Sequence, residues 1–311
     1  MQNLSYTKSV TLTEELSKID ELRKELLLYP LSPVEELQLQ WEAELERIHY
    51  LLALNGIAVS KEHIQSFLTP IGTKTPHPHE NLILSFKKAH DYLYHHWLVT
   101  KKSVTTDDLI VFYNEIFKGT FQIDTNTLET SLRYIQVNPE HPVIQAALAQ
   151  ILILTLNPFS DYNEQFSQLV FLLFLYKYGY DMKRLPIYAQ YFYHNISSYK
   201  DLILKTTRQQ NVTMWLEYVA SAVIHQLQKT VQMLKSNREE ISFNQDMFDL
   251  NDRQHAILTL FSMPDAKITN KIVQRKFKVS QITASRDLAK LSSLGIIFSI
   301  GKGRSTYYTK V

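Results

Sequence analysis

The sequence predicts a mainly α-helical protein in which a helical body is followed by a small basic module. Apolar residues recur at helical spacing through most of residues 12–236, and strand signal is almost absent there. The 311 residues include only seven Gly and ten Pro, which argues against turn-dense β folds and glycine-rich phosphate loops. Residues 251–311 contain eleven Lys or Arg and three Asp, a net charge of +8, which leaves −6 for the rest of a chain whose total is +2. This asymmetry is typical of a basic module attached to an acidic body.

Capping residues and helix breakers mark the ends of the helices in the body. Thr13 is expected to cap the first helix, Pro33 stands in the first turn of the second, and Asn55-Gly56 ends it. Ser60 is expected to cap a short third helix. The helices expected in this part of the chain cover residues 12–29, 33–54, 61–68, 80–98, 105–117, 142–156, 163–179, 195–207 and 211–236.

The composition also bounds the compartment in which the protein works. The chain has no Cys, which excludes disulfides and thiolate metal sites and indicates a reducing cytoplasm. The N-terminal residues lack the basic-then-apolar pattern of a signal peptide. The longest apolar run, SQLVFLLFLYKYG, is too short to span a bilayer and contains Lys177, so we expect a buried helix and no membrane contact.

The basic tail, residues 250–311, reads as three helices followed by a hairpin. Asn251 is expected to cap the first helix and Ser280 the third, and Gly301-Lys302-Gly303 is expected at the hairpin turn. This order resembles a winged helix-turn-helix, in which Leu288 and Leu291 lie in the core. The residues expected to contact DNA are Gln281, Thr283, Ser285, Arg286, Lys290, Lys302 and Arg304. Alternatively, such modules dimerise or dock onto proteins, and a charged helix face is often only solvated.

A polar segment, LNPFSDYNEQF, separates two very apolar runs at residues 156–166. Residues 141–168 as a whole resemble the active-site loop of the Fic family, whose pattern is H-P-F-x-D/E-G-N-G/K-R-x-x-R. The flanking helices and the Trp-Leu-Glu segment at residues 215–217 follow the order found in that family. The resemblance implies a mainly α fold: a Fic-like helical core, an N-terminal helical extension and a C-terminal winged helix with a small hairpin. The implied domains are an N-terminal arm (1–75), the core (76–236), a linker (237–249) and the winged helix-turn-helix (250–311).

Fic enzymes usually transfer AMP from ATP to a target hydroxyl, and the loop supplies a His base, a Mg²⁺-binding acid, an anion-binding turn and Arg residues. By this resemblance Asn157 stands at the base position, where an amide cannot accept a proton at neutral pH. The other positions fall into two groups. Pro158, Phe159, Asp161 and Asn163 are retained around the variable Ser160, whereas Tyr162 and Glu164 replace Gly, and Gln165 and Gln168 replace Arg. We therefore expect no cofactor, with ATP and Mg²⁺, on Asp161, bound only if residual activity exists.

Two further regions depart from the family pattern. The inhibitory motif of the family aligns with residues 51–57, where Leu51 takes the Ser position, Asn55 takes the Glu position and Gly56 is kept. Neither Asn55 nor Gln168 offers the charge that the inhibitory ion pair requires. The stretch from Gly119 to His141 is also short for the docking hairpin and helix that the family places there, and we expect a reduced version.

Together these features favour a catalytically inactive Fic-like scaffold or sensor with a DNA-binding winged helix, acting as a transcriptional regulator. DNA is the expected partner, a protein partner and a homodimer are compatible with the sequence, and the oligomeric state is open. Three alternatives stand beside this interpretation. They are AMP transfer with altered ATP and Mg²⁺ binding, a pure protein-interaction module, and an unrelated all-helical protein in which NPFSD is only a helix-breaking turn.

Overall fold

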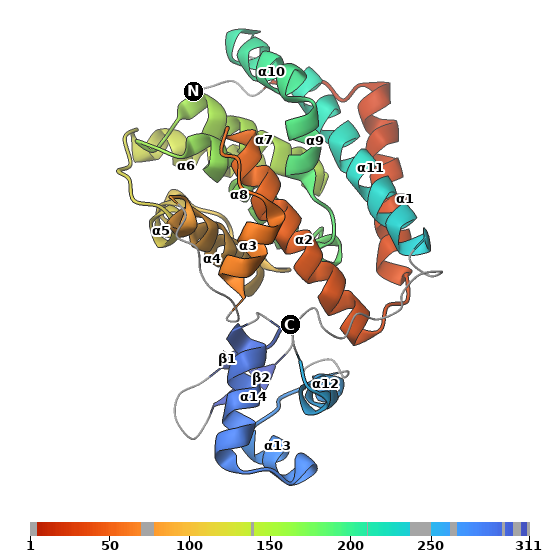
Figure 1. Cartoon of the computed structure of the whole chain (residues 1–311). Helices are drawn as coiled ribbons and strands as arrows, with labels where there is room; N and C mark the ends of the chain where they lie inside the picture. Colours follow the sequence, from red (N-terminus) through yellow and green to blue (C-terminus); the bar gives the residue numbers. More distant parts are fainter. Residues whose placement is uncertain are drawn as a thin grey trace. The chain divides into compact units, whose positions relative to one another are not determined.

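The computed structural model describes residues 5–69, 78–137, 140–209, 211–236, 250–261, 266–293, 296–300 and 306–309. The chain forms two compact units (Figure 1). The first unit comprises Met1–Tyr29, Glu42–Ile64 and Thr75–Lys235. The second comprises Pro30–Trp41, Gln65–Lys74 and Ser236–Val311, so the expected N-terminal arm is divided between the two. The expected linker, residues 237–249, lies outside the described residues.

The described elements are almost all helices, as the sequence predicts. In chain order they are α1 Val10–Leu28, α2 Pro33–Leu54, α3 Lys61–Leu68, α4 Glu80–Trp97, α5 Thr106–Ile116, α6 Thr125–Val137, α7 Pro142–Leu156, α8 Asn163–Lys177, η1 Met182–Arg184, α9 Tyr188–His194, α10 Ile196–Gln209, α11 Thr213–Ser236, α12 Asp252–Leu258, η3 Thr259–Phe261, α13 Asn270–Phe277, α14 Gln281–Ser293, and strands β1 Phe298–Ile300 and β2 Tyr307–Thr309.

Helices α7 and α8 form the centre of the first unit. Every residue of α7 from Val143 to Leu154 is buried, and so are nearly all residues of α8 after its first turn. Helices α4, α6 and α10 pack against this pair, which explains why its sequence is apolar on all sides. No helix in the described ranges is both long and apolar enough to cross a bilayer.

Helix α1 packs along α11 at the edge of the first unit (Figure 1). Its cap is Ser9, whose Oγ accepts a hydrogen bond from the N–H of Leu12 at 3.1 Å. The expected cap, Thr13, is therefore wrong: Thr13 lies inside the first turn, and its hydroxyl donates to the Ser9 carbonyl at 3.0 Å. The signal expected at the end of the second helix, Asn55-Gly56, is confirmed. Helix α2 ends at Leu54, and Gly56 follows it with φ +76°, while the N–H of Ile57 bonds to the Leu52 carbonyl at 3.0 Å.

The second unit has its own core. Asn251 caps α12 in a capping box with Gln254, and the N–H of Thr283 donates to the Ser280 hydroxyl at the start of α14, as expected. Strands β1 and β2 pair antiparallel, and Ile268 forms a bridge to Tyr308. The buried core includes the expected Leu288 and Leu291, together with Ile257, Phe261, Val273, Ala284, Ile297 and, from the start of α2, Leu37.

Candidate functional site

The loop between α7 and α8 turns the chain back through two left-handed residues. Asn157 ends α7 with φ 45° and ψ 60°, and its N–H bonds to the Ile153 carbonyl at 3.0 Å. Tyr162 precedes α8 with φ 56° and ψ 22°. Asn adopts this conformation readily, but a Tyr does so at a cost of roughly 1–2 kcal/mol. The loop thus keeps a glycine-like backbone at Tyr162 although the residue has a bulky side chain.

An aromatic contact offsets part of that strain. The Tyr162 ring stacks on Phe117, with ring centroids 4.8 Å apart and planes inclined by 8°. Such a pair contributes about 0.5–1.5 kcal/mol beyond its buried area. The side chain therefore holds the turn closed against the end of α5, at the position where the family has a Gly.

Asn163 and Phe159 fasten the two ends of the loop to each other. Asn163 Oδ1 accepts from the Phe159 N–H at 3.0 Å, and Asn163 Nδ2 donates to the Phe159 carbonyl at 2.6 Å. The Phe159 ring is buried and lies parallel to Tyr113, with centroids 3.8 Å apart. Tyr113 also donates from its hydroxyl to the Asp161 carbonyl at 2.8 Å. The side chains of Phe159 and Asn163 therefore have structural contacts that need no substrate, whereas Asp161 takes part through its backbone carbonyl.

The segment after α5 pairs with this loop by backbone hydrogen bonds. The Ser160 N–H bonds to the Thr120 carbonyl at 2.9 Å, and the Gln122 N–H bonds to the Pro158 carbonyl at 2.8 Å. Phe121 and Phe159 form an isolated antiparallel bridge. Gly119 is needed here, because a Cβ would run into the Tyr113 hydroxyl and Ser160. The shortened stretch between α5 and α7 contains helix α6 and this short pairing, which uses backbone groups of the loop itself.

The charges of the loop do not suit a phosphate. Glu164 is exposed in the first turn of α8, where the free N–H groups of a helix would otherwise attract an anion. The Asp161 carboxylate is exposed and accepts a hydrogen bond from Ser160 Oγ at 3.0 Å. Asn157 is exposed, and Gln165 is half-buried. In the described part of the chain, no group of three His, Cys, Asp or Glu residues could hold a metal ion.

Gln168, at the second Arg position of the family, is buried with 4% of its surface exposed. Its Nε2 donates to the Tyr199 hydroxyl at 2.8 Å, and burial raises the pKa of that phenol above its usual range, so it stays neutral. A neutral amide beside a neutral phenol provides no positive charge at this depth. The position therefore supplies packing and one hydrogen bond.

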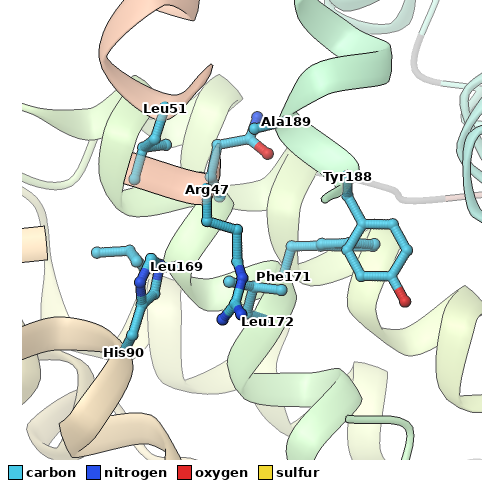
Figure 2. A pocket seen from close by; sticks show the side chains of 9 residues that line it. Arg47, Leu51, His90, Leu169, Phe171, Leu172, Tyr188 and Ala189 are labelled. Atoms are coloured by element: carbon cyan, nitrogen blue, oxygen red, sulfur yellow. The ribbon is translucent and has the colours of Figure 1, made fainter. Parts of the chain in front are cut away.

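Gln168 and Leu51 line the same small pocket, between α2, α4, α8 and α9. Figure 2 shows the Arg47 side chain running into it between His90 and Tyr188. The expected counterpart of the inhibitory helix is thus beside the second Arg position. Asn55, however, turns back on its own helix and donates from Nδ2 to the Leu51 carbonyl at 2.7 Å.

A buried ion cluster that the sequence did not reveal stands at this pocket. Glu44 Oε1 lies 2.8 Å from His90 Nδ1, and Glu44 Oε2 lies 3.3 Å from Arg47 Nη1. Arg47 Nη2 donates to the Arg184 carbonyl at 2.6 Å. Burial alone would raise the pKa of Glu44, but the charges of His90 and Arg47 outweigh burial and hold it well below its usual range. The positive charge of Arg47 is therefore neutralised by Glu44 within the fold.

The residues expected to contact DNA are mostly on the outside of α14. Gln281, Ser285 and Arg286 are exposed, whereas Thr283 and Lys290 are half-buried. Asn270 of α13 donates to Ser285 Oγ at 2.6 Å and to the Gln281 carbonyl at 3.3 Å, which fixes the start of α14 on α13. Lys302 and Arg304 lie outside the described residues, as does the expected hairpin turn.

An internal salt bridge holds α14 to α12. Asp287 is 3% exposed, and its carboxylate accepts from Arg253 Nε at 2.6 Å and from Gln254 Nε2 at 2.8 Å. The sequence marked Arg253 and Asp287 only as charges. Their pairing neutralises one charge of each sign, so it leaves the net positive charge of this unit unchanged.

Neither a protein-family model nor a curated protein matches the sequence. Solved structures do match. A Fic family protein from Desulfovibrio desulfuricans G20 is similar over 98% of this chain and 97% of its own, with a TM-score of 0.63 and 13% identity. Fic-1 from C. elegans is similar over 73% of each chain, with a TM-score of 0.55 and 17% identity. A second Fic-1 structure covers 72% of this chain and 73% of its own, with a TM-score of 0.58 and 15% identity. The chain therefore has the mainly helical fold of the Fic family proteins, as the sequence predicts.

Proposed function

We propose that this protein is a DNA-binding regulator built on a Fic-like core that has lost catalysis. The loop supports the second half of this proposal. Two of its retained residues serve structure through their side chains: Asn163 bonds to the Phe159 backbone, and the Phe159 ring stacks on Tyr113. The position of the base and the two Arg positions hold amides, and the two Gly positions hold a phenol ring and a carboxylate.

Loss of the base alone costs about 10²–10⁴-fold in rate, and loss of a charge-stabilising donor costs about 10²–10³-fold. Glu164 adds repulsion where phosphates would have to sit. Asp161 is the single acid retained from the motif, and Mg²⁺ usually takes several of its ligands from substrate phosphates. If ATP binds weakly, Mg²⁺ therefore lacks most of its ligands at this loop.

The observation that best supports DNA binding is the outward face of α14, which belongs to a strongly basic unit. The described residues of the tail include eight Lys or Arg, at positions 253, 267, 271, 275, 276, 278, 286 and 290, and two Asp, of which Asp287 is buried and paired. Helices α13 and α14, joined by a tight turn at Lys278 (φ 53°), have the order of a helix-turn-helix, and β1 with β2 has the place of a wing. Such a unit is suited to a polyanion with a groove wide enough for α14.

The test is binding of the full chain to a labelled random-sequence duplex, followed by fluorescence anisotropy between 50 and 200 mM salt. We expect affinity to fall steeply with salt, because each neutralised phosphate adds about 0.9 to the logarithmic slope. Arg286→Ala should weaken binding, while Arg208→Ala, an exposed arginine of α10, should not. Salt-independent binding, or equal behaviour of the two variants, would contradict this use of α14.

A further inference from the structure

One side chain on the outward face of α14 is out of character with its neighbours. Ile282 is 65% exposed in the first turn of the helix, directly after Gln281. Single exposed aliphatic residues are common and carry no meaning alone. Ile282 and Arg286 have the i, i+4 spacing, so these two side chains lie on the same face of the helix near its start, and Gln281 stands next to Ile282 in the first turn.

These three side chains are also the ones left unused by the fold. Ser285 accepts from Asn270, and Thr283 bonds to Ser280 through their hydroxyls at 2.9 Å. Within the described residues, neither Gln281 nor Arg286 has a side-chain hydrogen bond or ion pair. An amide, a branched aliphatic group and a guanidinium therefore project from a helix end whose position is fixed by the Asn270 clamp.

We infer that Ile282 reads the 5-methyl group of a thymine in the major groove, and that Arg286 reads a guanine beside it. This inference rests on the proposed function and names the ligand features that the same face recognises. Thymine is the one base that presents a methyl group in the major groove, where apolar side chains contact it, and Arg bonds in a forked manner to guanine O6 and N7. Four helical residues rise about 6 Å, close to two base-pair steps of about 3.4 Å, so the two bases lie within about two base pairs of each other.

Charge identifies duplex DNA as the occupant. The exposed cations Lys271, Arg275, Lys276 and Lys278 belong to α13 and the turn that leads into α14. The first helix of a helix-turn-helix crosses the phosphate backbone while the second lies in the groove. An apolar pocket on a protein would suit Ile282 but would not need these positive charges on the neighbouring helix and turn.

The test starts from duplexes that the full-length protein selects from a random pool. Each thymine of the selected site is then replaced by deoxyuridine, which removes only the methyl group, and Kd is measured by anisotropy. Loss of one buried methyl contact should weaken wild-type binding about fourfold at one thymine. Ile282→Ala should bind more weakly and show no further loss on the deoxyuridine duplex. Ile272→Ala, an isoleucine of α13 that is 39% exposed, should keep the full fourfold effect.

A second substitution checks the guanine. Replacing the guanine nearest that thymine with 7-deazaguanine should weaken the wild type but not Arg286→Ala. A selected site without a thymine effect, or a methyl effect that persists in Ile282→Ala, would overturn the inference while leaving DNA binding intact. If no duplex is enriched and no salt-sensitive binding is found, the proposed function fails together with this inference. In that case a protein would be the remaining candidate ligand for Ile282.

Discussion

Replacing Asn163 with Ala should lower the free energy of unfolding of the first unit by about 2 kcal/mol. The change removes both hydrogen bonds between the Asn163 amide and the Phe159 backbone, at 3.0 and 2.6 Å. A buried backbone group that loses its partner costs about 1–3 kcal/mol. Water can reach the neighbouring exposed Ser160, so the lower end of that range applies to each bond. In a unit of this size, the melting temperature should fall by roughly 4–8 °C.

Urea unfolding followed by circular dichroism measures this loss, and two variants calibrate it. Asn163→Asp keeps the acceptor for the Phe159 N–H and removes the donor to the Phe159 carbonyl, so it should fall between wild type and Asn163→Ala. Glu164→Ala, at an exposed position one residue away, should stay within about 0.5 kcal/mol of wild type. If Asn163→Ala is as stable as Glu164→Ala, the retained Asn does not serve the structure, and the argument that the family residues persist for folding is refuted.

The remaining predictions concern the buried carboxylate Glu44 of the first unit, and the Arg253–Asp287 ion pair and the turn at Lys278 of the second unit. The pKa of Glu44 is held below its unfolded value of about 4.5, so its contribution to the free energy of unfolding is present above that pH and is lost as the pH falls below it. In Glu44→Gln, the free energy of unfolding should therefore decrease less between neutral and acidic pH. Arg253→Ala leaves the buried Asp287 carboxylate with Gln254 as its remaining partner of the two, and should destabilise the second unit by about 2–3 kcal/mol. Adding Asp287→Asn to Arg253→Ala removes the unpaired charge and should restore part of this stability. Lys278 has a left-handed backbone (φ 53°), which strains any residue with a side chain, so Lys278→Gly should stabilise the same unit by about 1 kcal/mol. The same variant should reduce DNA affinity, because it removes a positive charge. An unchanged melting temperature would show that Lys278 is not strained.

Local signals in the sequence predict most helices correctly. Pro33, Asn55-Gly56 and Ser280 work because capping depends on groups within a few residues. The failure at Thr13 has the same origin, since Ser9 offers an equally good hydroxyl one turn earlier. Helix α6 was expected only as part of a reduced flap, although Asp124 caps it by accepting from the Thr127 N–H at 3.0 Å.

The candidate site divides into a predictable part and a hidden part. The loop bounds and the positions of Asn157 to Gln168 follow from a pattern that is continuous in sequence. The cluster of Glu44, Arg47 and His90 does not, because its members come from α2 and α4, which are brought together by packing. Pairing of the loop with residues 120–122 is hidden for the same reason, since backbone hydrogen bonds leave no trace in residue type.

Calorimetric titration of ATP with Mg²⁺ into the wild type and into Glu164→Gly tests directly whether the loop has lost its nucleotide site. We expect no heat of binding in the wild type, and weak binding in the variant once the carboxylate at the start of α8 is removed. Micromolar binding of ATP by the wild type would show that the loop still holds a nucleotide and would favour AMP transfer by an altered mechanism, with Asp161 as the ligand for Mg²⁺.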